Sequence, residues 1–78
     1  MVTITLSLKG PLKRYGPDQD KFAYSIDSNS ISIKDLIKHL GIAASSVSFA
    51  AINNEKTELD TLLEGGEKVT IYPRVVGG

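Results

Sequence analysis

The feature that most constrains this chain is a short helix signal at residues 31–41, where several local indicators agree. Apolar residues recur at i, i+3, i+4 and i+7, which places one apolar stripe on a helix: Ile33, Leu36, Ile37 and Leu40. Ser32 is a good N-cap, and Asp35 three residues later resembles a capping box with a shorter acid. Gly41 suits the left-handed residue that ends a helix. We therefore expect one helix at about 33–40.

Strand patterns surround this helix. Val2, Ile4, Leu6 and Leu8 alternate with polar residues, which is typical of a half-buried strand. Similar alternation predicts further strands at 22–26, 47–52 and 69–73, and a short edge strand at 55–59. Pro73 has no backbone donor, so the last strand should lose pairing there.

Turn residues separate these segments. Pro11 can open a single helical turn over 12–15, which Gly16 can close. Asn53 and Asn54 suit a tight turn with positive φ. Residues 60–67 read as a turn bent at Gly65 or Gly66. Because a strand rather than a helix follows these glycines, they do not predict a phosphate-binding loop.

Composition excludes several classes of function. The 78 residues form one small domain, and a domain of this size buries only about 60% of its unfolded surface, which leaves little room for a catalytic cleft. Nine basic and nine acidic residues balance, which argues against nucleic-acid binding. There is no cysteine and one histidine, so we expect no metal site, no bound cofactor and no enzyme activity of its own.

Targeting signals are likewise not expected. No apolar run approaches the roughly 18 residues of a membrane span. The first ten residues alternate like a strand rather than a signal peptide, so a cytoplasmic protein is the simplest expectation.

Two groups of charged residues are weak candidates for a site. His39 lies off the apolar stripe, in the last helical turn, and is best interpreted as a solvated residue that favours the helix dipole when protonated. Lys9, Lys13 and Arg14 form a loose basic cluster, for which a solvated surface is the default. The alternative is a docking patch for an acidic partner.

The end of the sequence is the strongest functional candidate. The last strand reaches Pro73, and Arg74, Val75, Val76, Gly77 and Gly78 follow. Val75 and Val76 favour extended backbone, and glycines fit narrow passages because they have no Cβ. We expect a domain at 1–73 and a flexible tail at 74–78, whose carboxylate at Gly78 can be activated in the ATP site of another protein. Such a protein needs neither a cysteine nor a pocket.

The order of elements predicts an α+β fold with the helix across one face of a mixed sheet of four to five strands. If the first strand is central and the last pairs beside it in parallel, this is a ubiquitin-like β-grasp fold. The stretch "LLEGGEKVTIYPRVVGG" resembles the C-terminal signature of the MoaD/ThiS-like β-grasp sulfur carriers, and "ISIKDLIKHLG" is similar to their helix. "GPLKRYG" is similar to the segment that follows the first strand in the molybdopterin branch, which is therefore ranked above the thiamine branch.

The resemblance implies a function and its partners. An E1-like adenylyltransferase would use ATP to adenylate Gly78, and a sulfurtransferase or desulfurase would supply sulfur for a thiocarboxylate. Gly77, Val76 and Val75 would enter the partner's active site, while Arg74, Pro73 and Tyr72 would contact its surface. The sulfur would then pass to an acceptor enzyme, such as the large subunit of molybdopterin synthase.

One departure leaves alternatives open. Many members of the molybdopterin branch have a second proline where this chain has Arg74. Because ubiquitin-like modifiers carry basic residues before their terminal glycines, conjugation of Gly78 to lysines is an alternative. A thiamine-type or other sulfur carrier, and an interaction module with an incidental tail, are the others.

Overall fold

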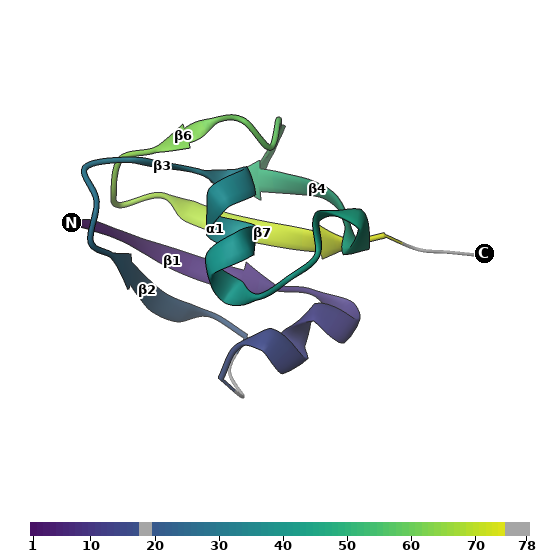
Figure 1. Ribbon diagram of the computed structural model, residues 1–78. Coiled ribbons are helices and arrows are strands. Elements are labelled where there is room, and N and C mark those ends of the chain that lie inside the picture. The colour runs from purple at the N-terminus through teal and green to yellow at the C-terminus, as the bar shows by residue number, and fades with distance from the viewer. Residues whose placement is uncertain (18–19, 75–78) are drawn as a thin grey trace.

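The computed structural model describes residues 1–17 and 20–74 of the chain. A five-stranded sheet forms the centre of the fold, and α1 (Ile33–Leu40) crosses one of its faces (Figure 1). The strands follow the spatial order β2 (Phe22–Ile26), β1 (Val2–Leu8), β7 (Lys68–Pro73), β4 (Val47–Ile52) and β5 (Glu55–Thr57). β1 and β7 are parallel, and the other neighbours are antiparallel. This is the β-grasp arrangement that the sequence predicts.

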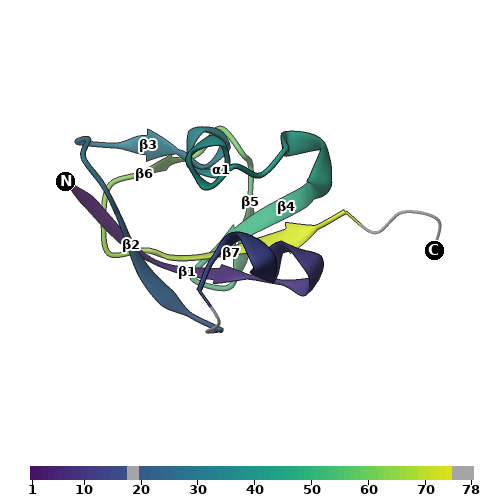
Figure 2. The same cartoon turned by 60° about the horizontal axis from the view of Figure 1, so that its bottom comes forward.

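The core lies between α1 and the sheet. The alternating residues of β1 are buried as expected, and so are Leu36 and Ile37 of α1 and Val69 and Ile71 of β7. Figure 2 shows α1 and a second small sheet on the same side of the main sheet. The opposite face of the main sheet carries hydroxyl side chains such as Thr3, whose Oγ1 lies 2.9 Å from Ser25 Oγ.

The ends of α1 are fixed by the residues that the sequence indicates. The Ser32 hydroxyl accepts a hydrogen bond from the backbone N–H of Asp35 at 3.1 Å, which satisfies one free donor of the first turn. Gly41 adopts φ 82°, the left-handed conformation that glycine tolerates best. His39 is exposed in the last turn, as predicted.

The tight turn at 53–54 is confirmed, since Asn53 and Asn54 have φ 52° and 72°. Asn53 also ties the turn to the last strand. Its backbone N–H donates to the carbonyl oxygen of Lys68, and its side-chain oxygen accepts from the Lys68 N–H. The edge strand that follows is shorter than predicted, because it ends at Thr57 rather than Leu59.

The prediction of a simple turn over residues 60–67 is wrong in one respect. Leu62 and Leu63 form β6 (Leu62–Leu63), which pairs antiparallel with β3 (Ile31–Ser32) beside the helix. Leu63 is fully buried and Leu62 is 59% exposed. A two-residue strand is too short to show an alternating pattern, so its pairing depends on contacts distant in sequence.

Two short 3-10 helices complete the described residues. η1 (Gly10–Tyr15) is the helical turn expected after β1, and it begins one residue earlier than Pro11. η2 (Ala44–Ser46) precedes β4 and has no counterpart among the predicted elements. Among residues 1–17 and 20–74, no helix is long and apolar enough to cross a membrane.

The turn before β7 is held by a carboxylate. Glu67 accepts hydrogen bonds from the backbone N–H groups of Glu64 and Gly65, at 2.8 and 2.7 Å. Gly65 and Gly66 have φ 128° and 84°, and the Gly66 N–H donates to the carbonyl oxygen of Thr3. The glycine pair is therefore a structural turn, as expected.

This turn predicts a pH dependence of stability. Burial alone would raise the pKa of Glu67, but the backbone donors outweigh it and hold that pKa below its ordinary value of 4.5. A lowered folded-state pKa stabilises the fold above the unfolded pKa, and this contribution is lost as the pH falls through the folded pKa. We expect Glu67→Ala to lower the free energy of unfolding by about 1 kcal/mol at neutral pH.

Chemical denaturation at several pH values tests this expectation. The difference between wild type and Glu67→Ala should shrink as the pH falls below 4.5. The matched control is Glu64→Ala, which leaves its own backbone N–H in place. A Glu67 effect that is independent of pH, or no larger than that of the Glu64 control, would contradict the role of the carboxylate.

Candidate functional site: the end of strand β7

The candidate site is the surface around the end of β7, where the described chain leaves the sheet. β7 ends on the side of the molecule opposite the N-terminus (Figure 1). Pro73 is opposite Val47 of β4, and the Arg74 N–H donates to the carbonyl oxygen of Ser46 at 2.9 Å. Hydrogen bonds therefore hold the backbone as far as Arg74. The ladder between β4 and β7 ends at Pro73, and the bond one residue further on joins Arg74 to Ser46 of η2.

Val75, Val76, Gly77 and Gly78 lie outside the described residues. The reactive carboxylate predicted at Gly78, and the three residues predicted to enter a partner's active site, therefore stay predictions. The domain boundary predicted at residue 73 likewise stays a prediction. The structure does place Tyr72, Pro73 and Arg74, the predicted contact residues, and brings other residues to them.

η1 packs against the end of β7. The Lys9 N–H donates to the carbonyl oxygen of Ile71 at 3.1 Å, and Leu12 is buried. Gly10 has φ 56°, and a Cβ at this position would lie 3.1 Å from Cγ of Pro73. Glycine is thus favoured at position 10 by both the backbone conformation and the close approach. The first loop is thereby fixed beside the end of β7.

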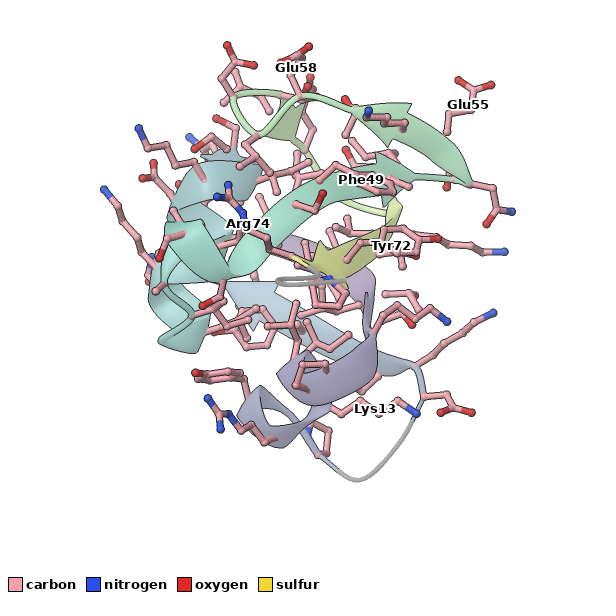
Figure 3. All side chains as sticks on the ribbon, turned by 90° about the vertical axis from the view of Figure 1, so that its right-hand side faces the viewer. Lys13, Phe49, Glu55, Glu58, Tyr72 and Arg74 are labelled. Carbon is pink, nitrogen blue, oxygen red and sulfur yellow. The ribbon has the colours of Figure 1, made fainter. Side chains whose placement is uncertain are left out.

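An aromatic pair lies on the outer face beside the same strand end. The rings of Phe49 and Tyr72 stack with centroids 4.5 Å apart, and Lys56 Nζ lies 5.1 Å from the centroid of Phe49. Figure 3 shows both rings on one side of β7, with the Arg74 side chain directed to the other side. Tyr72 is therefore half-buried by a cross-strand neighbour, and stacked aromatic pairs of this kind stabilise a sheet. Sequence reasoning did not pair Phe49 with Tyr72, because a bulge near Val47 sets the register.

On the helix side of β7, the strand end borders a small cleft of about 190 Å³, which we call the exit cleft. Its lining includes Pro11, Arg14 and Tyr15 of η1, Ser46 of η2, and Pro73 and Arg74. Arg14 and Arg74, which come from nearly opposite ends of the chain, both line the exit cleft. No local sequence pattern links the two arginines, which are 60 positions apart in the chain.

Lys13 and Arg14, which the sequence places in one basic cluster, have different partners in the structure. Lys13 Nζ lies 3.1 Å from Asp20 Oδ1, and this hydrogen bond, together with charge attraction, lowers the pKa of Asp20 below its ordinary value. Arg14 instead donates from Nη2 to the Tyr15 hydroxyl at 3.1 Å, with its guanidinium carbon 5.1 Å from the Tyr15 ring centroid. The charge of Lys13 is thus partly neutralised by Asp20, whereas the guanidinium of Arg14 lies against Tyr15.

A larger groove of about 830 Å³ runs along β4 and β5. Lys34, Lys56, Glu58 and Asp60 line it, so both signs of charge face it. Among residues 1–17 and 20–74, no group of three or more His, Asp or Glu side chains could hold a metal ion. No buried side-chain polar atom in this part of the chain lacks a hydrogen-bond partner.

Comparison with known proteins assigns the chain to a family. A family model described as Mut7-C ubiquitin matches residues 1–76. The chain belongs to the Mut7-C ubiquitin family. The match stops before Gly77 and Gly78, so it says nothing about the terminal glycines. A search of the curated proteins finds no significant match.

Three solved structures share the fold over nearly the whole chain. A putative molybdopterin converting factor, subunit 1, from Pyrococcus furiosus is 15% identical, with a TM-score of 0.69, 96% of this chain covered and 100% of the other. The HVO 2177 protein of Haloferax volcanii is 17% identical, with a TM-score of 0.73 and coverages of 99% and 87%. SAMP1 of the same organism is 16% identical, with a TM-score of 0.65 and coverages of 97% and 99%.

These comparisons confirm the predicted ubiquitin-like β-grasp fold and the resemblance to MoaD-like proteins. At identities of 15–17%, the solved structures speak for the fold of this Mut7-C ubiquitin family member. Function belongs to sites placed on a fold, so the activity has to be argued from the end of β7.

Proposed function

We propose that this protein is a carrier whose Gly78 carboxylate is adenylated and converted to a thiocarboxylate, which donates sulfur in the biosynthesis of a cofactor of the molybdopterin type. The observation that carries the proposal is the ending Pro73-Arg74-Val75-Val76-Gly77-Gly78 directly after the central strand of a β-grasp sheet. The proposal requires Gly78 to be the last residue of the working chain, as the sequence stands or after processing.

The chemistry takes place at one acyl carbon. A carboxylate oxygen of Gly78 attacks the α-phosphorus of ATP, pyrophosphate leaves, and an acyl-adenylate forms. Hydrosulfide then attacks the acyl carbon, AMP leaves with the C–O bond electrons, and one proton is released as the thiocarboxylate forms. Both steps take place in partner enzymes, which supply ATP, the catalytic groups and the sulfur source.

The proposal is supported by the way the fold holds the chain as far as Arg74. The backbone is held by hydrogen bonds through Arg74, and the fold keeps η1, η2 and β7 together around that residue. Four residues separate Arg74 from the end of the sequence and can span at most about 14 Å. A partner that acts on Gly78 must therefore lie against the end of β7, where Tyr72, Pro73 and Arg74 are proposed to contact it.

The same activation serves a second candidate function. If the amino group of a lysine attacks the acyl-adenylate instead of hydrosulfide, AMP leaves and an amide bond joins Gly78 to that lysine. The observation that favours this protein-modifier function is Arg74, which stands where many molybdopterin-branch members have proline. The two functions share adenylation and differ in the nucleophile.

Pyrophosphate–ATP exchange tests the shared step. The chain is incubated with ATP, labelled pyrophosphate and an E1-like adenylyltransferase from the same organism. We expect exchange that depends on this chain and disappears when Gly77 and Gly78 are removed. Exchange no greater than with the enzyme alone would contradict both functions and favour an interaction module with an incidental tail.

A further inference from the structure

We propose that the exit cleft is a docking site for a carboxylate-bearing loop of the partner protein, with Arg14 and Arg74 as paired contacts. The identity of this partner as the protein that handles Gly78 rests on the proposed function, whereas the preference of the cleft for carboxylates does not. The inference adds Arg14 and η1 to the contact residues expected from the sequence, and it names the chemistry of the surface they meet.

The first step is that the exit cleft is lined by two arginines that come from different elements of the fold. Arg14 comes from η1 and Arg74 follows β7, and both line the exit cleft. The Tyr15 ring and hydroxyl hold the Arg14 guanidinium, and the hydrogen bond to Ser46 holds the Arg74 backbone. A planar guanidinium binds a carboxylate through two parallel hydrogen bonds, so arginine is suited to that partner group.

The second step is the charge of the cleft. Its described lining contains two arginines and no Asp or Glu. The one ion pair between described residues, Lys13–Asp20, involves neither arginine. By contrast, the larger groove along β4 and β5 contains Glu58 and Asp60 beside its lysines. In a chain with balanced charge, the exit cleft is thus a locally positive surface, and positive surfaces steer acidic partners toward them.

The third step decides between a protein carboxylate and a free anion. Both arginines are exposed, and an exposed ion pair is too weak to retain a small ion. A protein partner removes water from the same groups when it docks, which strengthens their interaction with a carboxylate. Nucleic acid is disfavoured because its affinity grows with the number of neutralised phosphates, and the cleft offers two cations.

The fourth step is distance. Any enzyme that reaches Gly78 must approach within about 14 Å of Arg74, as the span of four residues requires. Such an enzyme docks near the exit cleft, so a carboxylate on its surface comes within reach of Arg14 and Arg74.

The experiment uses hexaglutamate as the probe and amide NMR spectra of the full chain at low salt. We expect shift changes at Arg14, Tyr15, Ser46 and Arg74 on titration. The double variant Arg14→Ala/Arg74→Ala should weaken binding at least about fivefold. The control Lys34→Ala/Lys38→Ala removes two exposed cations from α1 and should change the dissociation constant less than about twofold.

Several outcomes would overturn the proposal. Amide shift changes at Lys34 and Lys38 that are as large as those at the cleft residues would indicate non-specific attraction. Inorganic phosphate that reproduces the cleft shifts with equal affinity would indicate a site for a free anion. An absence of shifts at the cleft would overturn the proposal directly.

A second measurement separates this inference from the proposed function. Removal of Gly77 and Gly78 should leave hexaglutamate binding unchanged, since the described lining of the cleft extends no further than Arg74. With an E1-like enzyme that supports exchange, Arg14→Glu should slow adenylation at least about tenfold, while Lys34→Glu should not. Peptide binding without any adenylation would retain the cleft and reject the proposed carrier function. Adenylation that is insensitive to Arg14→Glu would reject the cleft as the docking site.

Discussion

Removal of Gly77 and Gly78 is expected to reduce adenylation of the chain below detection while the midpoint of thermal unfolding stays within about 1 °C. The reacting carbon is lost, whereas the core that the structure describes between α1 and the sheet is built from residues between Val2 and Ile71. Pyrophosphate–ATP exchange and a thermal melt, measured on the same preparation, test both halves of this expectation.

A matched pair of extended chains gives a sharper version of the test. One alanine added after Gly78 should block activation, because it removes the free glycine carboxylate. One alanine added before Met1 should have no effect, since the N-terminus lies on the side of the molecule opposite the end of β7 (Figure 1). Activity retained by the C-terminal extension, without removal of the added residue, would contradict the role of Gly78.

The second large effect is on stability. Leu36→Ala is expected to lower the free energy of unfolding by about 3 kcal/mol, because it removes a fully buried side chain and leaves a cavity. Native proteins have about 5–15 kcal/mol of stability in total, so this variant should lose about a fifth of it or more. Chemical denaturation followed by circular dichroism measures the change.

The matched control changes the same residue type on the surface. Leu62 is 59% exposed, so Leu62→Ala should change the free energy of unfolding by less than about 0.5 kcal/mol. Equal effects of the two substitutions would contradict the assignment of Leu36 to the core. The fold would then depend on contacts other than the packing of α1 on the sheet.

Elements with a local cause were predictable from the sequence. The helix at 33–40 follows from its apolar stripe, from Ser32 as N-cap and from Gly41 in the left-handed conformation. The turn at Asn53 follows from the tolerance of asparagine for positive φ. Each of these features depends on residues that are close together in sequence.

Features that depend on pairing between distant segments were not predictable. β6 is two residues long, and it forms because Leu63 is opposite Ile31. The exit cleft requires η1, η2 and β7 to meet, and the stacking of Phe49 on Tyr72 requires the bulge in β4. The chemistry proposed for Gly78 rests on the last residues of the sequence themselves and stays a proposal.

The mass of the C-terminal peptide tests the central claim most directly. The protein is incubated with ATP, its E1-like adenylyltransferase and a sulfur donor, and the C-terminal peptide is then analysed by mass spectrometry. The account predicts that one oxygen is replaced by one sulfur, and that the change maps to Gly78. A C-terminal peptide that keeps its ordinary carboxylate, in a mixture where the enzyme activates a known carrier, would contradict the account.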